Sequence, residues 1–260
     1  MENPTHDPFP APLEAACACA GDVGVVLLHG KAGTPTGRVA ELGTALKRCG
    51  FRVSVPVMPW AEDRIYSASY EDSLREIDRE VRQLKREGAK LVAVAGHSLG
   101  ANAAIGYGAW TRADAIVALA PAHYPDQGRM RERFAADVGR ARELIAAGKG
   151  GHKQTFSDLN QDVPLQVTAT AEAYLSWFDP EGPAVMPRNA AAFKAATPLL
   201  VIIGAGERTA RWRHYFFEKA PPHPKSAFTV VSGDHVEVPD RAIAQVQEWL
   251  RRLDPGAVEH

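Results

Sequence analysis

Gly96-His97-Ser98-Leu99-Gly100 directly follows the apolar run Leu91–Ala95 and directly precedes a stretch rich in small residues. The pattern predicts a strand that turns abruptly into a helix, because glycine two positions either side of the serine removes the β-carbons that would collide in so tight a turn. The turning residue, Ser98, is then strained and exposed at the end of its strand. These five residues therefore indicate a nucleophile elbow.

The composition of the chain is that of an ordinary globular protein. Its 260 residues are 45% hydrophobic and 23% charged, with a net charge of −1. This length is sufficient for one α/β domain with a large core. The near-neutral charge gives no electrostatic reason to expect nucleic acid or an anionic membrane as a partner. We therefore expect neither, and expect a monomer or a homodimer that acts on a small molecule.

Cysteine usage and the N-terminal sequence bear on the compartment. Three cysteines are too few for a disulfide framework, and Cys17 and Cys19 lack the further ligands that a zinc site needs. No basic region followed by an apolar segment marks a signal peptide, and no run approaches the roughly 20 apolar residues of a membrane span. The sequence thus predicts reduced thiols, no metal and cytoplasmic residence.

Strand and helix patterns alternate from residue 23 onward. Apolar runs occur at Val23–Leu28, Val53–Met58, Leu91–Ala95, Ala115–Ala120, Leu199–Ile203 and Phe228–Val231. Several of these runs are continuous, as expected for strands that are covered on both faces. Helical spacing lies between them, most clearly at Leu74, Ile77, Val81 and Leu84. The alternation predicts an α/β fold with a mostly parallel sheet and helices on both faces.

One long interval interrupts this alternation. From about His123 to Thr197 we find no convincing continuous β run, and proline, glycine and helix-like pieces are mixed. We expect an extended lead-in at residues 1–22, a core formed by 23–122 and 198–253, and a mainly helical cap inserted at 123–197. Such a cap would lie over the carboxyl edge of the sheet, where α/β proteins bind ligands.

Several side chains are candidates for substrate contact. Met130 and Phe134 share one face of a predicted cap helix, Trp177 and Phe178 belong to an aromatic cluster, and His97 lies within the elbow. For each cap residue the alternative that it simply covers the sheet stays open.

A serine hydroxyl needs a base that removes its proton during attack, so Ser98 requires an imidazole within hydrogen-bond reach. His235 is the candidate, because it follows the last predicted strand on a short loop with a glycine turn. That position allows the side chain to reach back to the elbow. His29 and His123 also lie at strand ends, but one belongs to a different motif and the other opens the cap.

The base in turn needs a carboxylate that fixes its tautomer and offsets its transient charge. Glu207 follows the strand Leu199–Ile203 and gives the chain order serine, acid, histidine. It can alternatively be a helix-start carboxylate favoured by the helix dipole. Asp126 is the reserve acid, and Asp234, adjacent to His235, is expected to shape the turn.

An oxyanion that forms at Ser98 requires preorganised donors, usually two backbone N–H groups. Leu99, the residue after the nucleophile, supplies one. The second is expected from Lys31 in His29-Gly30-Lys31-Ala32-Gly33, where the glycines allow close backbone approach. For the Lys31 side chain there are two alternatives, attraction of an anionic substrate and simple solvation, and we expect solvation.

With elbow, histidine-glycine loop, acid and late histidine in this order, the chain resembles the α/β-hydrolase superfamily from about Val23 to Leu253. Typical members have an eight-stranded, mostly parallel sheet, and the resemblance implies a Ser98–Glu207–His235 triad. This chain departs from the pattern in two ways. The region before Val23 is short for the usual two leading strands, and the acid is glutamate where aspartate is commoner.

The resemblance implies hydrolysis of carboxylic esters of small to medium acyl chain through an acyl-enzyme, without a cofactor. Thioesterase, lipase and C–C bond hydrolase activities are neighbours on the same fold. The alternative from a different class is a ligand-binding or receptor-like protein that keeps the triad but turns over slowly.

Overall fold

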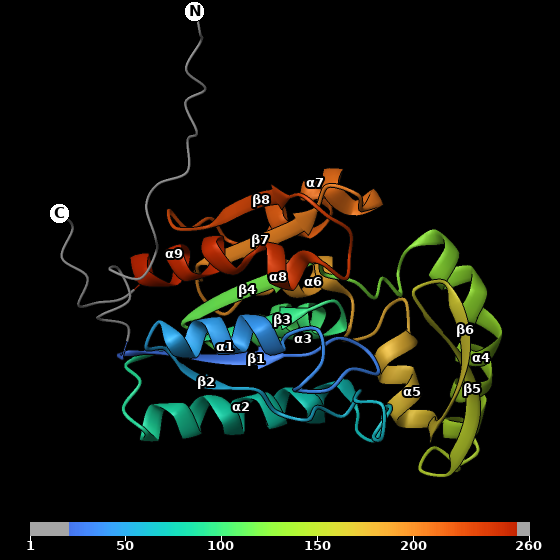
Figure 1. Ribbon diagram of the computed structural model, residues 1–260. Helices are drawn as coiled ribbons and strands as arrows, with labels where there is room; N and C mark the ends of the chain where they lie inside the picture. The colour runs from blue at the N-terminus through green and yellow to red at the C-terminus, as the bar shows by residue number, and fades with distance from the viewer. Residues whose placement is uncertain (1–20, 254–260) are drawn as a thin grey trace, which may run out of the picture.

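The computed structural model describes residues 21–253, and a parallel sheet of six strands lies at its centre (Figure 1). The strands are β1 (Val23–Leu28), β2 (Arg52–Ser54), β3 (Leu91–His97), β4 (Ala115–Leu119), β7 (Leu199–Gly204) and β8 (Ala227–Val231). Their order is β2-β1-β3-β4-β7-β8, and every neighbouring pair is parallel. The predicted α/β fold with a mostly parallel sheet is therefore confirmed. In this order the carboxyl end of β3, which carries the elbow, lies between β1 and β4.

Each of the six apolar runs identified in the sequence contains a strand. The least accurate prediction is Val53–Met58, where β2 already ends at Ser54. Pro56 accounts for the early end, because proline has no N–H to donate to a neighbouring strand. At β1, by contrast, all six residues are buried, which agrees with a strand covered on both faces.

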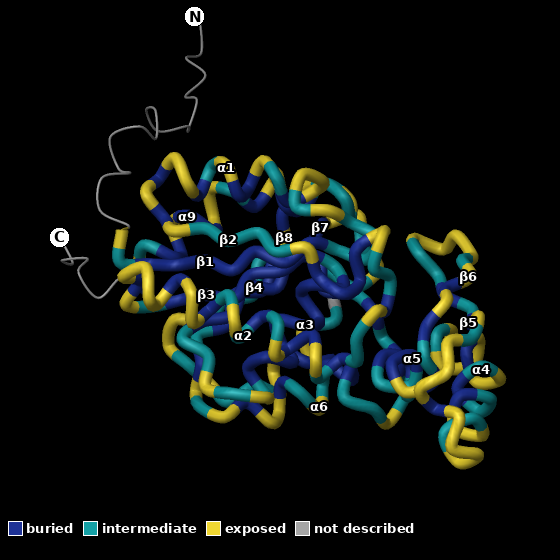
Figure 2. The backbone as a smooth tube through the Cα atoms, turned by 90° about the horizontal axis from the view of Figure 1, so that it is seen from below, coloured by how far each residue is buried: buried dark blue, intermediate teal, exposed yellow. Residues whose placement is uncertain are grey.

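Helices cover both faces of the sheet (Figures 1 and 2). One face carries α2 (Tyr70–Arg86), α3 (Leu99–Trp110) and α6 (Met186–Ala191), whose apolar residues share a core with Val26 and Leu28 of β1. The other face carries α1 (Ala40–Arg48), α8 (Val238–Arg241) and α9 (Ile243–Leu253), which share a core with Val25 and Leu27. The alternating strand residues thus supply two separate hydrophobic layers.

The segment between β4 and β7 contains helices, as we expected, and in addition a pair of strands that we did not expect. It contains α4 (Gly128–Ala146), the antiparallel hairpin β5 (Lys153–Asn160) and β6 (Val163–Thr170), α5 (Ala171–Phe178) and then α6. Figure 1 shows α4 and the hairpin beside the carboxyl edge of the sheet. Gln161 and Asp162 form the two-residue turn, with φ of 49° and 64°. Positive φ at both residues suits the twist of a hairpin.

The hairpin escaped sequence analysis because its strands are buried on one face only. In β5, Phe156 and Asp158 point inward between more exposed neighbours, and in β6 Val167 and Ala169 do the same. A search for continuous apolar runs passes over such an alternating pattern.

Several expectations concern residues that the structure does not describe. The lead-in at 1–22 lies outside the described part except for Gly21 and Asp22, and Cys17 and Cys19 lie outside it as well. Within residues 21–253 the main sheet has six strands, not the eight of typical members of the resembled superfamily. None of the helices described in this range has the length and apolarity needed to cross a bilayer.

The tight packing of the elbow predicts the effect of adding a single methyl group. A β-carbon on Gly96 would overlap the backbone carbonyl of Gly100, whereas one on Gly139 of α4 would meet nothing within 4 Å. We expect Gly96→Ala to lower the free energy of unfolding by more than about 3 kcal/mol. Gly139→Ala should raise it by up to about 1 kcal/mol, since alanine favours helix. Urea denaturation of both variants tests this, and equal midpoints would contradict the packing described.

Candidate active site

Ser98 occupies a strained turn between β3 and α3. Its φ of 57° and ψ of −118° lie in a region that side chains other than hydrogen rarely adopt. Its N–H donates to the carbonyl of Leu119 at 3.0 Å, and its own carbonyl accepts from the N–H of Ala122 at 3.2 Å. Both bonds tie the turn to the end of β4, so the neighbouring strand maintains the strained conformation.

The glycine that follows the serine brings α3 against the end of β1. A β-carbon on Gly100 would lie 2.6 Å from the carbonyl oxygen of His29 and 2.7 Å from that of Leu28. No side chain other than hydrogen fits in this space. The start of α3 and the loop after β1 therefore lie in direct backbone contact.

Three sequence-predicted residues meet at the carboxyl edge of the sheet. His235, after β8, places its Nε2 2.9 Å from Ser98 Oγ, and its Nδ1 lies 2.8 Å from Oε2 of Glu207, after β7. A carboxylate only accepts, so Nδ1 carries the proton and donates to Glu207, while Nε2 is left to accept from the Ser98 hydroxyl. The second oxygen of Glu207, Oε1, accepts from the N–H of Gly204 at 2.9 Å, which fixes the carboxylate.

The other two carboxylates considered in the sequence have different partners. Asp126 accepts from the hydroxyl of Tyr215 at 2.6 Å and from the side-chain amide of Gln127 at 2.8 Å. Asp234 accepts from the backbone N–H of Val236 at 3.0 Å, and so forms part of the turn before α8. Neither of them makes a hydrogen bond to the His235 ring in the described part of the chain.

His97 fixes the backbone of the loop that carries His235, and it does not line the cavity at the site. Its Nε2–H donates to the backbone carbonyl of His235 at 2.9 Å, and the ring is 4% exposed. Burial, with the nearby His235 as the next cause, lowers the pKa of His97 to about 4. The expectation that His97 contacts substrate is therefore not supported by its position. Its neutral ring instead fixes the backbone from which His235 projects.

The loop after β1 packs directly against the elbow. A β-carbon on Gly30 would lie 3.2 Å from Cβ of Ser98, so the backbone at Gly30 and Lys31 passes close to the serine. The N–H groups of Lys31 and Leu99 donate to no other described residue. That these two groups bind an oxyanion stays a prediction.

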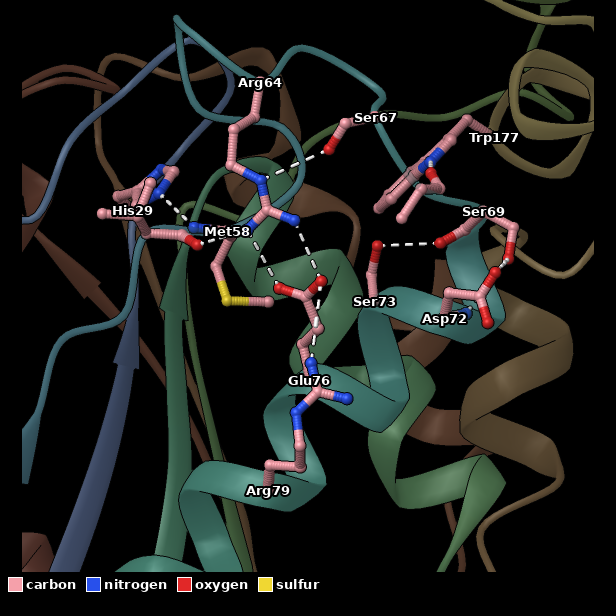
Figure 3. Close-up of polar contacts among 12 residues, drawn as sticks. His29, Met58, Arg64, Ser67, Ser69, Asp72, Ser73, Glu76, Arg79 and Trp177 are labelled. Carbon is pink, nitrogen blue, oxygen red and sulfur yellow. Dashed lines mark hydrogen bonds and ion pairs between the residues drawn. The ribbon is translucent and has the colours of Figure 1, made fainter.

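His29 and Trp60 support that loop from below. Nε2 of His29 accepts from the N–H of Met58 at 3.1 Å (Figure 3), and its Nδ1–H donates to the carbonyl of Gly30 at 2.8 Å. Trp60 donates its indole N–H to the carbonyl of His29 at 2.8 Å and accepts from the N–H of Ala32 at 2.9 Å. Together these bonds hold Ala32 at a φ of 50°.

The Lys31 side chain is not solvated, contrary to our expectation. Its ammonium donates to Asp158 Oδ1 at 2.6 Å and to the carbonyl of Leu159 at 2.8 Å. The two charged side chains are 9% and 0% exposed. The solvated alternative was wrong because Asp158 lies on the hairpin that the sequence analysis missed.

A cavity of about 1110 Å³ opens above Ser98. Its lining comes from the elbow, from the start of α4, from the tip of the β5–β6 hairpin and from the segment after β7. Met130 lines it, as expected, and so do Tyr124 and Trp212, which the sequence analysis did not single out. These two rings pack edge to face, with centroids 5.5 Å apart. The available signal for these two residues was that each is an aromatic residue in the segment that follows a strand of the main sheet, β4 for Tyr124 and β7 for Trp212.

The remaining cap candidates lie in the core. Phe134, Trp177 and Phe178 are each at most 2% exposed and do not line the cavity. Trp177 packs edge to face on Trp60 and Tyr70, with centroids 5.6 and 4.8 Å away. The alternative weighed for these residues, that they cover the sheet, fits their positions.

The described part of the chain offers no group of three His, Cys, Asp or Glu side chains arranged to hold a metal ion. His123, which opens the cap, donates its Nε2–H to the carbonyl of Trp177 at 2.7 Å, and its buried Nδ1 makes no hydrogen bond to a described residue.

Comparison with known proteins assigns the family. The model of the alpha/beta hydrolase family matches residues 25–246 of this chain. The chain belongs to the alpha/beta hydrolase family. The match spans β1 to the middle of α9, and so includes the elbow, Glu207 and His235. No curated protein matches this alpha/beta hydrolase closely enough to add a relative.

Solved structures agree with this fold at low sequence identity. A monoacylglycerol lipase from Paleococcus ferrophilus is 20% identical, with 89% of this chain and 95% of that chain covered and a TM-score of 0.62. An esterase from Pyrococcus furiosus is 19% identical, with 90% and 82% covered and a TM-score of 0.57. At this identity the similarity shows the alpha/beta hydrolase fold alone.

Proposed function

We propose that this alpha/beta hydrolase is a serine esterase that cleaves carboxylic esters of small to medium acyl chain through an acyl-enzyme intermediate. The observation that carries the proposal is the continuous path from Ser98 through His235 to Glu207, with contacts of 2.9 and 2.8 Å. Geometry of this kind couples a nucleophile, a base and an orienting acid. The neighbours named as a lipase and an esterase point to the same reaction class.

In the acylation step, Ser98 Oγ attacks the ester carbonyl carbon while its proton passes to Nε2 of His235. The carbonyl oxygen becomes an oxyanion, which the N–H groups of Leu99 and Lys31 stabilise. Glu207 offsets the charge of the imidazolium without taking its proton. His235 then gives the proton to the leaving alcohol as the C–O bond breaks.

In the deacylation step, a water molecule replaces the alcohol. His235 takes a proton from the water as its oxygen attacks the acyl carbon, and returns a proton to Ser98 Oγ as the acyl–oxygen bond breaks. The product acid leaves and the resting state is restored. The two halves use the same donors because the two intermediates share one geometry.

The cavity over Ser98 has room for an ester of small to medium acyl chain. Its volume of about 1110 Å³ lies slightly above the roughly 300–1,000 Å³ typical of small-molecule sites, and the cap core beside it is filled by aromatic rings. Thioesters and C–C bonds are chemical alternatives for the same residues, and a chain-length series of nitrophenyl esters measures the preference directly.

A fluorophosphonate probe tests the proposal against a slow, receptor-like protein. We expect stoichiometric labelling of the wild type, because an activated serine displaces fluoride from phosphorus. Ser98→Ala should abolish the labelling. A folded wild type that neither labels nor hydrolyses any ester of the series would remove the esterase proposal.

The acid assignment predicts a contrast between two carboxylates. Glu207→Gln should lower kcat by at least about 100-fold, because the amide no longer fixes the His235 tautomer. The matched change Asp126→Asn should leave kcat within about threefold, since Asp126 bonds to Tyr215 instead. Steady-state kinetics with circular dichroism as a folding control measure both. A reversed order would transfer the role to Asp126.

The pH profile should show a single loss of activity toward acid. His235 accepts a proton only when neutral, and imidazoles change charge between about pH 5 and 8. Burial lowers the pKa of His97 to about 4 and that of His123 to about 3, so both stay neutral throughout this range. A decline in kcat/KM within this range therefore does not come from His97 or His123. A constant rate from pH 5 to 8 would contradict the role of His235 as base.

A further inference from the structure

A buried ion pair joins the cap hairpin to the loop that carries one oxyanion donor. Lys31 Nζ lies 2.6 Å from Oδ1 of Asp158 on β5, and the other carboxylate oxygen accepts from the hydroxyl of Tyr66 at 3.0 Å. The ammonium also donates to the carbonyl of Leu159 at 2.8 Å. Three segments far apart in the chain thus meet at one carboxylate: the loop after β1, the loop before α2 and the hairpin.

The pair is buried and lies near aromatic rings, and Lys31 also lines the cavity. Lys31 Nζ lies 5.7 Å from the ring centroid of Phe178 and 5.9 Å from that of Tyr66. Burial lowers the pKa of Lys31, and Asp158 opposes that shift. A buried ion pair contributes little stability relative to apolar side chains of the same volume, since both charges leave water. Stability alone is therefore a weak explanation for its presence.

The backbone of Lys31 is fixed on either side by other contacts. On one side His29 is held by Met58 and Trp60, and on the other Ala32 donates to the carbonyl of Trp60 at 2.9 Å. Ala32 itself has a φ of 50°, in the left-handed region. The peptide N–H of Lys31 lies between these anchors, and the Lys31 side chain adds a third contact, to the hairpin.

The loop that supplies Tyr66 is anchored in its turn. Arg64 makes two hydrogen bonds to Glu76 on α2, at 2.9 and 3.1 Å, and a further one to Ser67 (Figure 3). Tyr66 is buried with a φ of 52°. A non-glycine residue in this region is held there by its surroundings. Its hydroxyl therefore gives Asp158 a fixed partner on the core side.

We propose that Asp158 and the Lys31 side chain are positioning residues, through which the cap hairpin sets the direction of the Lys31 N–H toward the oxyanion. The inference rests on the esterase function proposed above. Asp158 is 1% exposed and does not line the cavity, so it does not contact substrate itself, and its charged partner is Lys31. The cap is then part of the catalytic geometry as well as the wall of the cavity.

Asp158→Asn and the double variant Lys31→Met/Asp158→Leu test the proposal. The double variant removes both charges together and leaves neither buried ion unpaired. We expect both to lower kcat about 10- to 100-fold with KM within about threefold, below the cost of losing a whole donor. Affinity for a trifluoromethyl ketone, which forms an oxyanion on Ser98, should fall by the same factor as kcat.

Asp137→Ala is the matched control. Asp137 of α4 accepts from the N–H of Ser157, the residue next to Asp158, at 2.7 Å and pairs with Arg140. It anchors the same strand without touching Lys31, and we expect kcat and ketone affinity within about threefold of the wild type. An equal loss in this control would show that any loosening of the hairpin suffices, and would overturn the proposal.

Two further outcomes also overturn it. One is a kcat and a ketone affinity near those of the wild type in the folded double variant. If the double variant does not fold, the same result in Asp158→Asn overturns the proposal. The other is a raised KM with unchanged kcat, which would mean that Lys31 contacts substrate and does not orient a donor. If the fluorophosphonate probe labels the wild type and either outcome is observed, the positioning role is wrong while the esterase function stands.

Discussion

The close approach of two backbone segments at the elbow is the constraint from which the site follows. Gly96 and Gly100 leave no room for a side chain, so β3 turns into α3 within the space of Ser98. The same absence of side chains lets α3 begin against the carbonyls of Leu28 and His29. One steric condition therefore places the nucleophile, the first N–H of α3 and the loop after β1 within reach of a single reacting atom.

Four histidines lie near the elbow, and their surroundings give them different roles. His29, His97 and His123 are buried, and each donates one ring N–H to a backbone carbonyl. Burial lowers the pKa of each of these three histidines, which favours the neutral ring, and each ring fixes the backbone to which it bonds. His235 alone among these four faces a carboxylate on one side and a hydroxyl on the other. Its part in the chemistry comes from those partners and not from residue type.

The sequence was most informative where local pattern and chain order carry the information. Each strand of the main sheet overlaps an apolar run, and Glu207 and His235 follow from their places after particular strands. The β5–β6 hairpin could not be predicted from the sequence, because a strand buried on one face has a weaker hydrophobic pattern. The partner of Lys31 could not be predicted either, because a buried ion pair depends on tertiary contact. Asp158 on the inward face of β5 was the missed signal. Likewise, composition does not divide the aromatic residues of the cap into core and cavity lining. Of the four cap residues predicted to contact substrate, only Met130 lines the cavity.

The hairpin tie has a consequence for how such a protein can change its substrate range. An insertion between two strands is ordinarily regarded as a module, replaceable without cost to the machinery beneath it. If a different cap without an acidic residue at the position of Asp158 replaced this one, the Lys31 ammonium would be buried without a partner for its charge. Changes in the cap are therefore easiest to accommodate at the tip of the β5–β6 hairpin and on its outer surface. A change on the inward side of β5 requires a matching change in the loop after β1, which it contacts.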